Sequence, residues 1–229
     1  MLPRVVLLPG MDGTGALFRP FLAAAKGEFS ATVIQYPTDK LLDYAALAEL
    51  VSSQLPVDER FVLLAESFSG PIAISLAACK PKGLTGLVLC ATLARNPRPA
   101  LGRLAPVLGL LHLARMPAGV ISFLFLGRVA TSELHDDLSQ VFRKLDRSVV
   151  ANRLRSILEV DVTGELEQIE IPVLYLMASE DRLVPASAAK LFESSQRNRW
   201  VTRLTGPHLL LQSAPHEVLA TVREFLGSL

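Results

Sequence analysis

Residues 61–70 read FVLLAESFSG, an apolar run that ends in a serine among small side chains. The run Phe61–Ala65 suits a buried strand, and a helix-like segment follows it. A sharp turn from strand to helix accepts only small residues two positions on either side of its central residue. Such a turn would lift the hydroxyl of Ser67 above the sheet, beside helix amides that favour developing negative charge. Ser67 is therefore a candidate nucleophile, and a structural serine that caps the helix is the alternative.

Apolar runs of strand length alternate with helix-like segments on both sides of this turn. Continuous apolar runs are typical of parallel strands buried on both faces, and the alternation predicts helices on both sides of one sheet. The predicted strands are Val5–Leu8, Ala31–Gln35, Phe61–Ala65, Leu84–Cys90, Val173–Met177 and Trp200–Leu204. The predicted helices are Asp43–Leu55, Phe68–Lys80, Ala186–Ser194 and Pro215–Leu226. The sequence therefore predicts an α/β protein with a mainly parallel sheet.

The segment 95–166 interrupts this alternation. It contains helical patterns over Leu134–Leu145 and Val149–Leu158 but no convincing strand. Twelve of the 23 residues from 104 to 126 are Leu, Val, Ile or Phe. The part from 95 to 132 has five arginines and no acidic residue, which gives the whole segment a net charge of about +3. We expect a helical insertion with a basic first half.

Composition excludes several classes of function. The 23 basic residues nearly balance 22 acidic ones, so no global charge attracts nucleic acid. Cys79 and Cys90 have neither CxxC spacing nor neighbouring histidines, which predicts two buried free thiols and no zinc site. Arg115, Pro106 and Pro117 interrupt the longest apolar stretch, so stable insertion into a membrane is not expected. No secretion signal is visible, and we expect a cytoplasmic protein.

Two further candidate residues follow predicted strands. Asp181 lies in ASEDRLVP, residues 178–185, after the strand Val173–Met177. His208 lies in TGPHL, residues 205–209, after the last strand. An aspartate that only caps the following helix is the alternative for Asp181.

In these features the chain resembles the α/β-hydrolase superfamily. In this family the turn that carries the nucleophile usually has the sequence Gly-x-Ser-x-Gly, and here Ala65 and Ser69 replace the two glycines. The resemblance implies a catalytic triad of Ser67, Asp181 and His208, in the chain order that the fold expects. Asp181 rather than its neighbour Glu180 matches the family's acid.

The loop PGMDGTG, residues 9–15, follows the first predicted strand. In the family this loop supplies one amide of the oxyanion hole, commonly from His-Gly-x, and Pro9 replaces the histidine here. The resemblance implies that the backbone N–H groups of Met11 and Phe68 form the oxyanion hole. The glycine spacing is not that of a dinucleotide-binding loop, and no Gly-Lys-Ser/Thr follows, which argues against nucleotide binding.

The resemblance also implies an architecture. The first strand here corresponds to the family's third, so we expect about six strands, a core of residues 1–94 and 167–229, and a helical cap of residues 95–166. The strand Ala31–Gln35 would then be an exposed edge, which could favour a homodimer.

The resemblance implies a serine carboxylesterase that hydrolyses short- to medium-chain acyl esters of small molecules through an acyl-enzyme, without a cofactor or metal. A thioesterase, an acyl-carrier methyl-ester hydrolase and an acyltransferase remain alternatives. Arg95, Arg98 and Arg103 could meet an acidic carrier protein, or could form a solvated basic face. A binding protein on an inactive hydrolase scaffold is the alternative that is not an enzyme.

Overall fold

A computed structural model describes residues 3–97, 117–128, 131–193 and 198–229. Its centre is a six-stranded sheet in the order β2-β1-β3-β4-β5-β6, and every neighbouring pair is parallel. The strands are β1 (Arg4–Leu8), β2 (Ser30–Val33), β3 (Phe61–Glu66), β4 (Leu84–Cys90), β5 (Val173–Ala178) and β6 (Arg199–Leu204). The predicted α/β fold with about six strands is confirmed, and β2 is an edge strand as expected.

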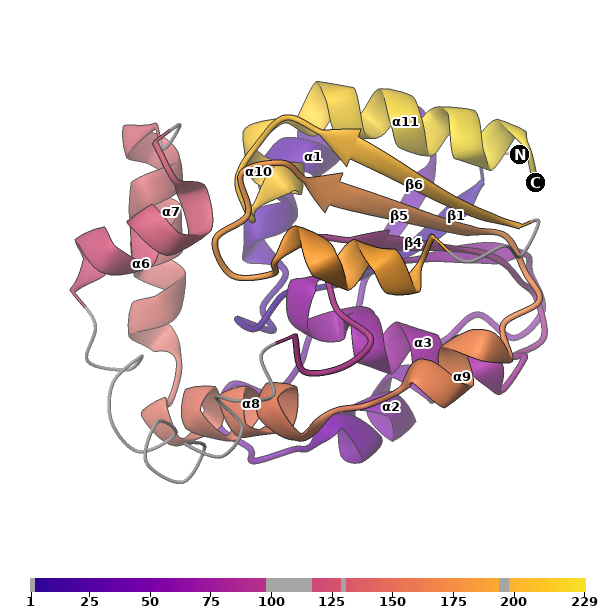
Figure 1. Ribbon diagram of the computed structural model, residues 1–229, viewed down its shortest axis with the longest axis horizontal. Coiled ribbons are helices and arrows are strands. Elements are labelled where there is room, and N and C mark those ends of the chain that lie inside the picture. The colour runs from indigo at the N-terminus through magenta and orange to yellow at the C-terminus, as the bar shows by residue number, and fades with distance from the viewer. Residues whose placement is uncertain (1–2, 98–116, 129–130, 194–197) are drawn as a thin grey trace.

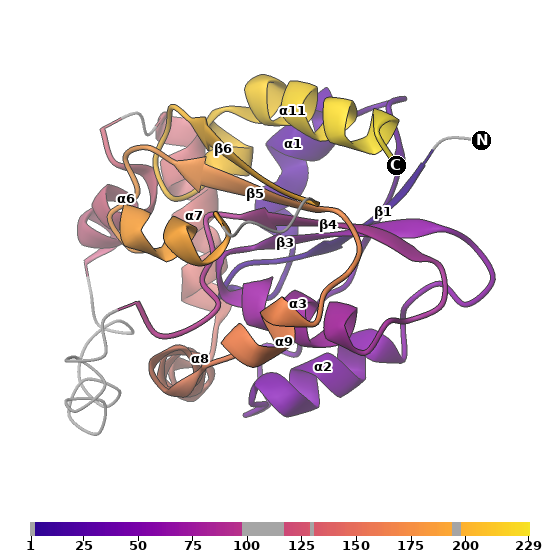
Figure 2. The same ribbon diagram turned by 45° about the vertical axis from the view of Figure 1, so that its right-hand side comes forward.

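Helices cover both faces of the sheet (Figures 1 and 2). One face carries the 3-10 turn η1 (Ala16–Phe18), α1 (Arg19–Ala24), α10 (Leu210–Ser213) and α11 (Pro215–Gly227). The other face carries α2 (Tyr44–Ser52), α3 (Gly70–Ala78), α9 (Thr163–Glu167) and the 3-10 helix η4 (Ala186–Leu191). Because both faces are covered, the central strands can be apolar at every position.

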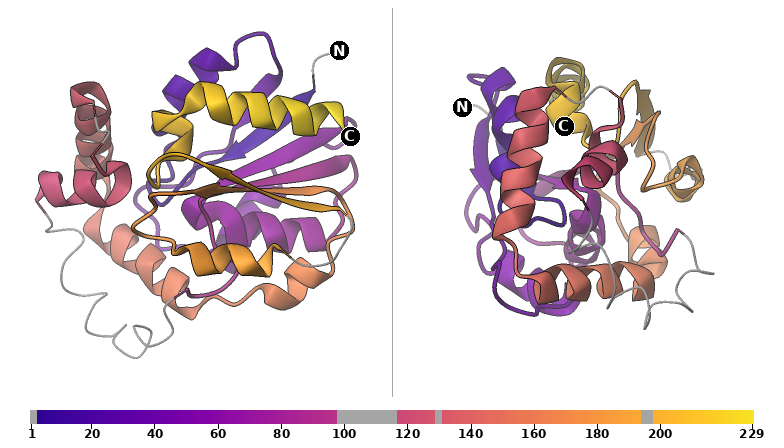
Figure 3. Two further views of the ribbon diagram at one scale, coloured as in Figure 1. Left: turned by 45° about the horizontal axis from the view of Figure 1, so that its top comes forward. Right: turned by 90° about the vertical axis from the view of Figure 1, so that its left-hand side faces the viewer.

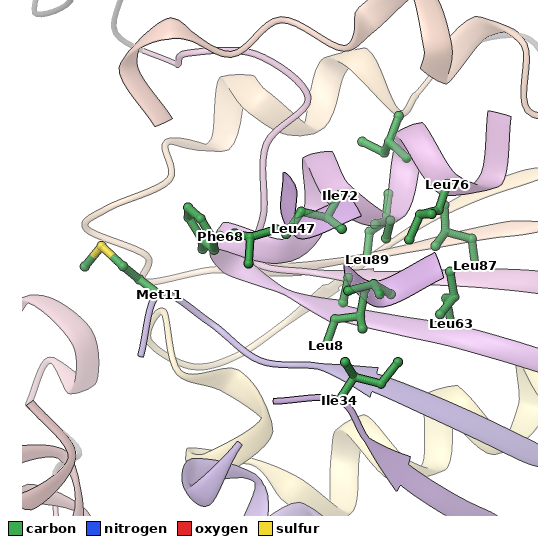
Figure 4. Close-up of a cluster of buried hydrophobic side chains, with 14 of the residues drawn as sticks. Leu8, Met11, Ile34, Leu47, Leu63, Phe68, Ile72, Leu76, Leu87 and Leu89 are labelled. Carbon is green, nitrogen blue, oxygen red and sulfur yellow. The ribbon is translucent and has the colours of Figure 1, made fainter. Parts of the chain in front are cut away.

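The side chains of alternate strand residues pack into two separate cores, one on each face of the sheet. Val6, Leu8 and Leu63 point to the α2–α3 side, whereas Val5 and Leu7 point to the α1–α11 side. Figure 4 shows the first core, with leucines from β1, β3 and β4 beneath side chains of α2 and α3. These cores fix the carboxyl ends of the strands, where the predicted site residues lie.

The described part of the segment 95–166 includes three helices that lie apart from those packed on the sheet. They are α6 (Ala118–Leu126), α7 (Ser132–Lys144) and α8 (Arg147–Glu159). Figures 1 and 3 show α6 and α7 beyond the carboxyl ends of β5 and β6, with α8 running back towards α2. The part of the predicted helical insertion from 98 to 116 lies outside the described residues.

Two expectations were wrong in detail. Cys90 is buried, but Cys79 is exposed because it caps the carboxyl end of α3, where the helix leaves the core. The helix predicted over Ala186–Ser194 is a 3-10 helix, η4, that ends at Leu191.

Candidate active site

The turn after β3 has the strained geometry that its sequence predicts. Ser67 has φ 51°, in the left-handed region that few residues other than glycine adopt, and it begins the 3-10 turn η2 (Ser67–Ser69) that leads into α3. The turn is crowded, because a Cβ added to Gly70 would lie 2.6 Å from Cγ2 of Thr92. The Thr92 hydroxyl donates a hydrogen bond to the Ser67 carbonyl and so braces the turn. The backbone of Ser67 is held in one place as a result.

The structure brings Ser67, His208 and Asp181 together in one hydrogen-bonded chain. The Ser67 Oγ lies 2.7 Å from His208 Nε2, and His208 Nδ1 lies 2.8 Å from Asp181 Oδ2. The other carboxylate oxygen of Asp181 accepts hydrogen bonds from the amides of Leu183 and Val184, both at 2.8 Å. Ser67 is partly exposed, whereas the side chains of His208 and Asp181 are 1% and 5% exposed. This is the arrangement of a hydroxyl, a base and an orienting acid.

The surroundings favour the charged form of the imidazole. Burial lowers the pKa of His208, but the attraction and hydrogen bond of Asp181, together with attraction to Glu66, outweigh burial. The pKa of His208 therefore lies above its ordinary value of 6.5. An imidazolium that forms when His208 takes a proton would be stabilised in place.

The two amides expected for an oxyanion hole lie beside Ser67. Phe68 directly follows Ser67. Gly10, the residue before Met11, also lies close to the Ser67 side chain, because a Cβ added to Gly10 would be 3.9 Å from the Cβ of Ser67. Phe68 lies in the first turn after β3, where the opening N–H groups of a helix have no carbonyl partner in the preceding turn.

Ser69, the other hydroxyl of the turn, has a structural position. It is fully buried, donates a hydrogen bond to the Pro9 carbonyl, and lies 2.6 Å from the Tyr36 hydroxyl. It ties the loop after β1 to the turn after β3 and has no access to a substrate.

A buried carboxyl group that sequence reasoning gave no role lies under the site. Glu66 is 1% exposed, and its Oε2 accepts a hydrogen bond of 3.2 Å from Gln212. Burial raises the pKa of Glu66 to about 7, although Gln212 and His208 act in the opposite direction. The signal in the sequence was a glutamate in the last position of an otherwise apolar strand.

A buried arginine of the insertion was also missed. Arg153 in α8 is 2% exposed and donates hydrogen bonds to the carbonyl groups of Met11 and Pro37. The signal in the sequence was its position in α8, one helical turn after Val149 and Val150 and so on the apolar face of that helix.

Helix α6 of the insertion contacts the histidine loop. The rings of Phe125 and His208 meet edge to face, with centroids 5.6 Å apart, and the Leu209 amide donates to the Phe125 carbonyl. Arg182, next to Asp181, donates to the Phe123 carbonyl, and its guanidinium lies 4.2 Å from the centroid of the Phe123 ring. The insertion therefore packs against both loops that carry the base and the acid.

The described residues offer neither a metal site nor a membrane span. Within these ranges, no three His, Cys, Asp or Glu side chains group so that they could hold a metal ion. No helix in the same ranges is long and apolar enough to cross a membrane.

Comparison with known proteins places this geometry in a family. The model of the alpha/beta hydrolase family matches residues 5–221. The biotin biosynthesis bifunctional protein BioHC of Cellvibrio japonicus is 24% identical over 99% of the chain, which spans only 48% of that relative's length. The pimeloyl-[acyl-carrier protein] methyl ester esterase of Aeromonas salmonicida is 26% identical over 98% of the chain and 96% of its own.

Solved structures agree on the fold. The enol-lactonase from Burkholderia xenovorans superposes with a TM-score of 0.83 over 99% of this chain and 92% of its own, at 16% identity. With a family match over nearly its whole length and the same fold, the chain belongs to the alpha/beta hydrolase family.

Proposed function

We propose that this chain is a serine hydrolase that cleaves carboxylic esters through an acyl-enzyme. The observation that carries the proposal is the chain of hydrogen bonds from Ser67 through His208 to Asp181, at 2.7 and 2.8 Å. His208 Nε2 takes the proton of Ser67 as its Oγ attacks the acyl carbon. The tetrahedral oxyanion accepts hydrogen bonds from the Met11 and Phe68 amides.

The intermediate collapses when His208 donates its proton to the leaving alcohol. Water then repeats the sequence on the acyl-enzyme, with His208 as the base, and frees the acid and Ser67. Asp181 holds the Nδ1 proton on the side away from Ser67, which keeps Nε2 unprotonated and facing the hydroxyl.

The first test combines activity with covalent labelling. Ser67→Ala should lower kcat on a p-nitrophenyl ester by roughly 10⁴–10⁶ and abolish labelling by a fluorophosphonate. Ser69→Ala is the matched control, because Ser69 lies two residues away and should leave labelling in place. Wild-type protein that does not react with the fluorophosphonate would show a binding protein on an inactive scaffold instead.

The acid is tested by two neighbouring carboxyl groups. Asp181→Asn should lower kcat by roughly 10³–10⁴, because an amide favours the wrong imidazole tautomer. Glu180 is exposed, so Glu180→Gln should change kcat little. If Glu180→Gln had the larger effect, the assignment of Asp181 would be wrong.

We further propose that residues 95–166 form a cap that sets acyl specificity for short to medium chains. Phe125 supports this, because it is buried, contacts the His208 ring and packs edge to face on Phe142. Each substrate methylene buried against such side chains gains about 0.8 kcal/mol until the site is full. The value of kcat/KM on p-nitrophenyl esters from acetate to palmitate should therefore rise and then fall. A flat profile would mean that the cap does not line the acyl site.

A carrier-bound methyl ester is the second candidate substrate. The Aeromonas salmonicida relative, which matches along almost its full length, is named for that activity. Of the three arginines that could meet an acidic carrier or form a solvated basic face, Arg98 and Arg103 lie outside the described residues. Arg95 is exposed and forms an isolated antiparallel β-bridge with Asp161. Hydrogen bonds from Thr163 lower the pKa of the Asp161 carboxyl, and attraction to Arg95 adds a smaller effect. Comparing the hydrolysis of one methyl ester free and attached to a carrier protein decides between the candidates.

A further inference from the structure

A guanidinium group from the insertion lies behind the loop that carries the Met11 amide. Arg153 is among the largest fully buried side chains of the described chain, at 2% exposure. Its Nη1 donates to the Met11 carbonyl at 2.7 Å, and its Nη2 donates to the Pro37 carbonyl at 2.8 Å. Burying a charge costs free energy of folding, so a buried guanidinium group needs hydrogen-bond acceptors and a compensating charge around it.

The loop is built closely around this group. A Cβ on Gly13 would lie 2.6 Å from Nη1 of Arg153, which is too close. Gly13 also has φ 73°, a backbone conformation that residues with a side chain rarely adopt. The Gly13 carbonyl accepts a hydrogen bond of 2.7 Å from the Tyr36 amide. The guanidinium carbon lies 5.8 Å from the centroid of the Tyr36 ring and 5.9 Å from that of Phe68, within the range of a cation–π contact.

Charge compensation comes from the same loop. Asp12 is 3% exposed, attracts Arg153, and accepts hydrogen bonds from the amide and hydroxyl of Thr14 at 2.8 and 2.5 Å. Burial lowers the pKa of Arg153, and attraction to Asp12 opposes that change. An arginine remains charged under these conditions, so its two hydrogen bonds to carbonyl groups are charge-assisted.

Helix α8 is anchored beside this contact. Asn152 Nδ2 donates to the Leu42 carbonyl at 2.9 Å, and the Asp146 amide donates to the Thr38 carbonyl at 3.4 Å. The helix is therefore held along the segment after β2 by bonds that do not involve Arg153.

We propose that Arg153 is a positioning residue for the oxyanion hole. By holding the Met11 carbonyl and filling the space behind Gly13, it keeps the Met11 N–H, on the other side of the same Cα, directed at the place beside Ser67. The substrate carbonyl oxygen gains negative charge in the transition state, so Arg153 should raise kcat and should affect KM much less. This role rests on the proposed serine hydrolase function.

The test separates turnover from binding in two variants. Arg153→Met removes both hydrogen bonds, and Arg153→Lys keeps the charge but not the forked donor. Arg153→Met should lower kcat per fluorophosphonate-labelled site by about 10²–10³, as the loss of one oxyanion donor does, and Arg153→Lys should have a smaller but clear effect. KM for a p-nitrophenyl ester should change less than about threefold in both.

The control variant is Asn152→Ala, which removes a bond between the same helix and the core. It should lower the melting temperature without a comparable loss of kcat. Exogenous guanidinium at about 10–50 mM should restore part of the kcat of folded Arg153→Ala by occupying the vacated site. The assay is run well below the melting temperature of that variant, where a gain in stability alone leaves kcat unchanged.

The outcomes are distinguishable. Wild-type kcat in folded Arg153→Lys, or a loss carried by KM alone, would overturn the positioning role and leave the hydrolase intact. Should Arg153→Met fail to fold, Arg153→Lys still decides, and a folded lysine variant whose kcat equals that of Asn152→Ala refutes the proposal. An unlabelled wild-type protein would refute the proposed function itself.

Discussion

Glu66 should make the protein less stable as the pH rises from 5.5 to 8.5. Its carboxyl has an ordinary pKa of 4.5 in the unfolded chain, and burial raises the pKa to about 7 in the folded protein. A raised pKa means that the folded state holds the proton more tightly. The full stability is therefore present below pH 4.5 and declines until the pH passes about 7. The shift corresponds to about 3.5 kcal/mol, because each pKa unit is worth about 1.4 kcal/mol.

The part of this loss that lies between pH 5.5 and 8.5 is about 2 kcal/mol, since the unfolded carboxyl is already ionised at the lower value. For a chain of this length that corresponds to a melting temperature about 4–8 °C lower. Glu66→Gln keeps the shape and removes the ionisation, so its stability should depend less on pH by that amount. His208, whose pKa is also raised, contributes to the decline in both proteins.

The assay is urea unfolding of wild type, Glu66→Gln and Glu180→Gln at pH 5.5, 7 and 8.5. The exposed Glu180 controls for the loss of one negative charge near the site. Parallel stability curves for wild type and Glu66→Gln would refute the reasoning, because they would mean that Glu66 titrates alike in the folded and unfolded chain.

Three further predictions concern the site and its frame. The acid limb of kcat/KM should have an apparent pKa above 6.5, because His208 must be neutral to act as a base; a limb below 6.5 would contradict its surroundings. Gly70→Ala should lower the free energy of unfolding by about 1–3 kcal/mol, since the new Cβ meets Thr92, whereas Gly164→Ala, with nothing within 4 Å, should not; urea unfolding compares them. Phe125→Ala should shift the chain-length maximum of kcat/KM and cost about 3–5 kcal/mol of stability, and an unchanged profile would remove Phe125 from the acyl site.

The sequence predicted those parts of the molecule that depend on local pattern. The strands β1, β3, β4 and β5 are largely apolar because both faces of the sheet are covered, so their order and type could be inferred before the structure. Ser67, Asp181 and His208 could be named because each stands just after a strand, and the parallel sheet brings the carboxyl ends of its strands to one edge. Their contact at hydrogen-bond distance is what the fold adds.

The remaining features depend on tertiary packing, which the local pattern marks only in part. Glu66 ends an apolar strand and Arg153 lies on the apolar face of α8, but only the assembled fold shows that each is almost fully buried. The prediction that Cys79 is buried was wrong because it relied on the apolar pattern of its helix. The helix ends at Cys79 and leaves the thiol exposed.

These buried charges have a common explanation in the proposed mechanism. Its transition state separates charge, with a positive imidazole at His208 and a negative oxygen beside the Met11 amide. Glu66 attracts the imidazole, and the guanidinium of Arg153 lies behind the loop that faces the oxygen. Burial disfavours the charged form of each group, and each charge is opposite in sign to the one that develops on its own side of Ser67. We infer that the fold retains both because they stabilise that separation, which predicts that Glu66→Gln raises stability above pH 7 while it lowers kcat. A variant that gained stability and kept full kcat would separate the burial of Glu66 from catalysis.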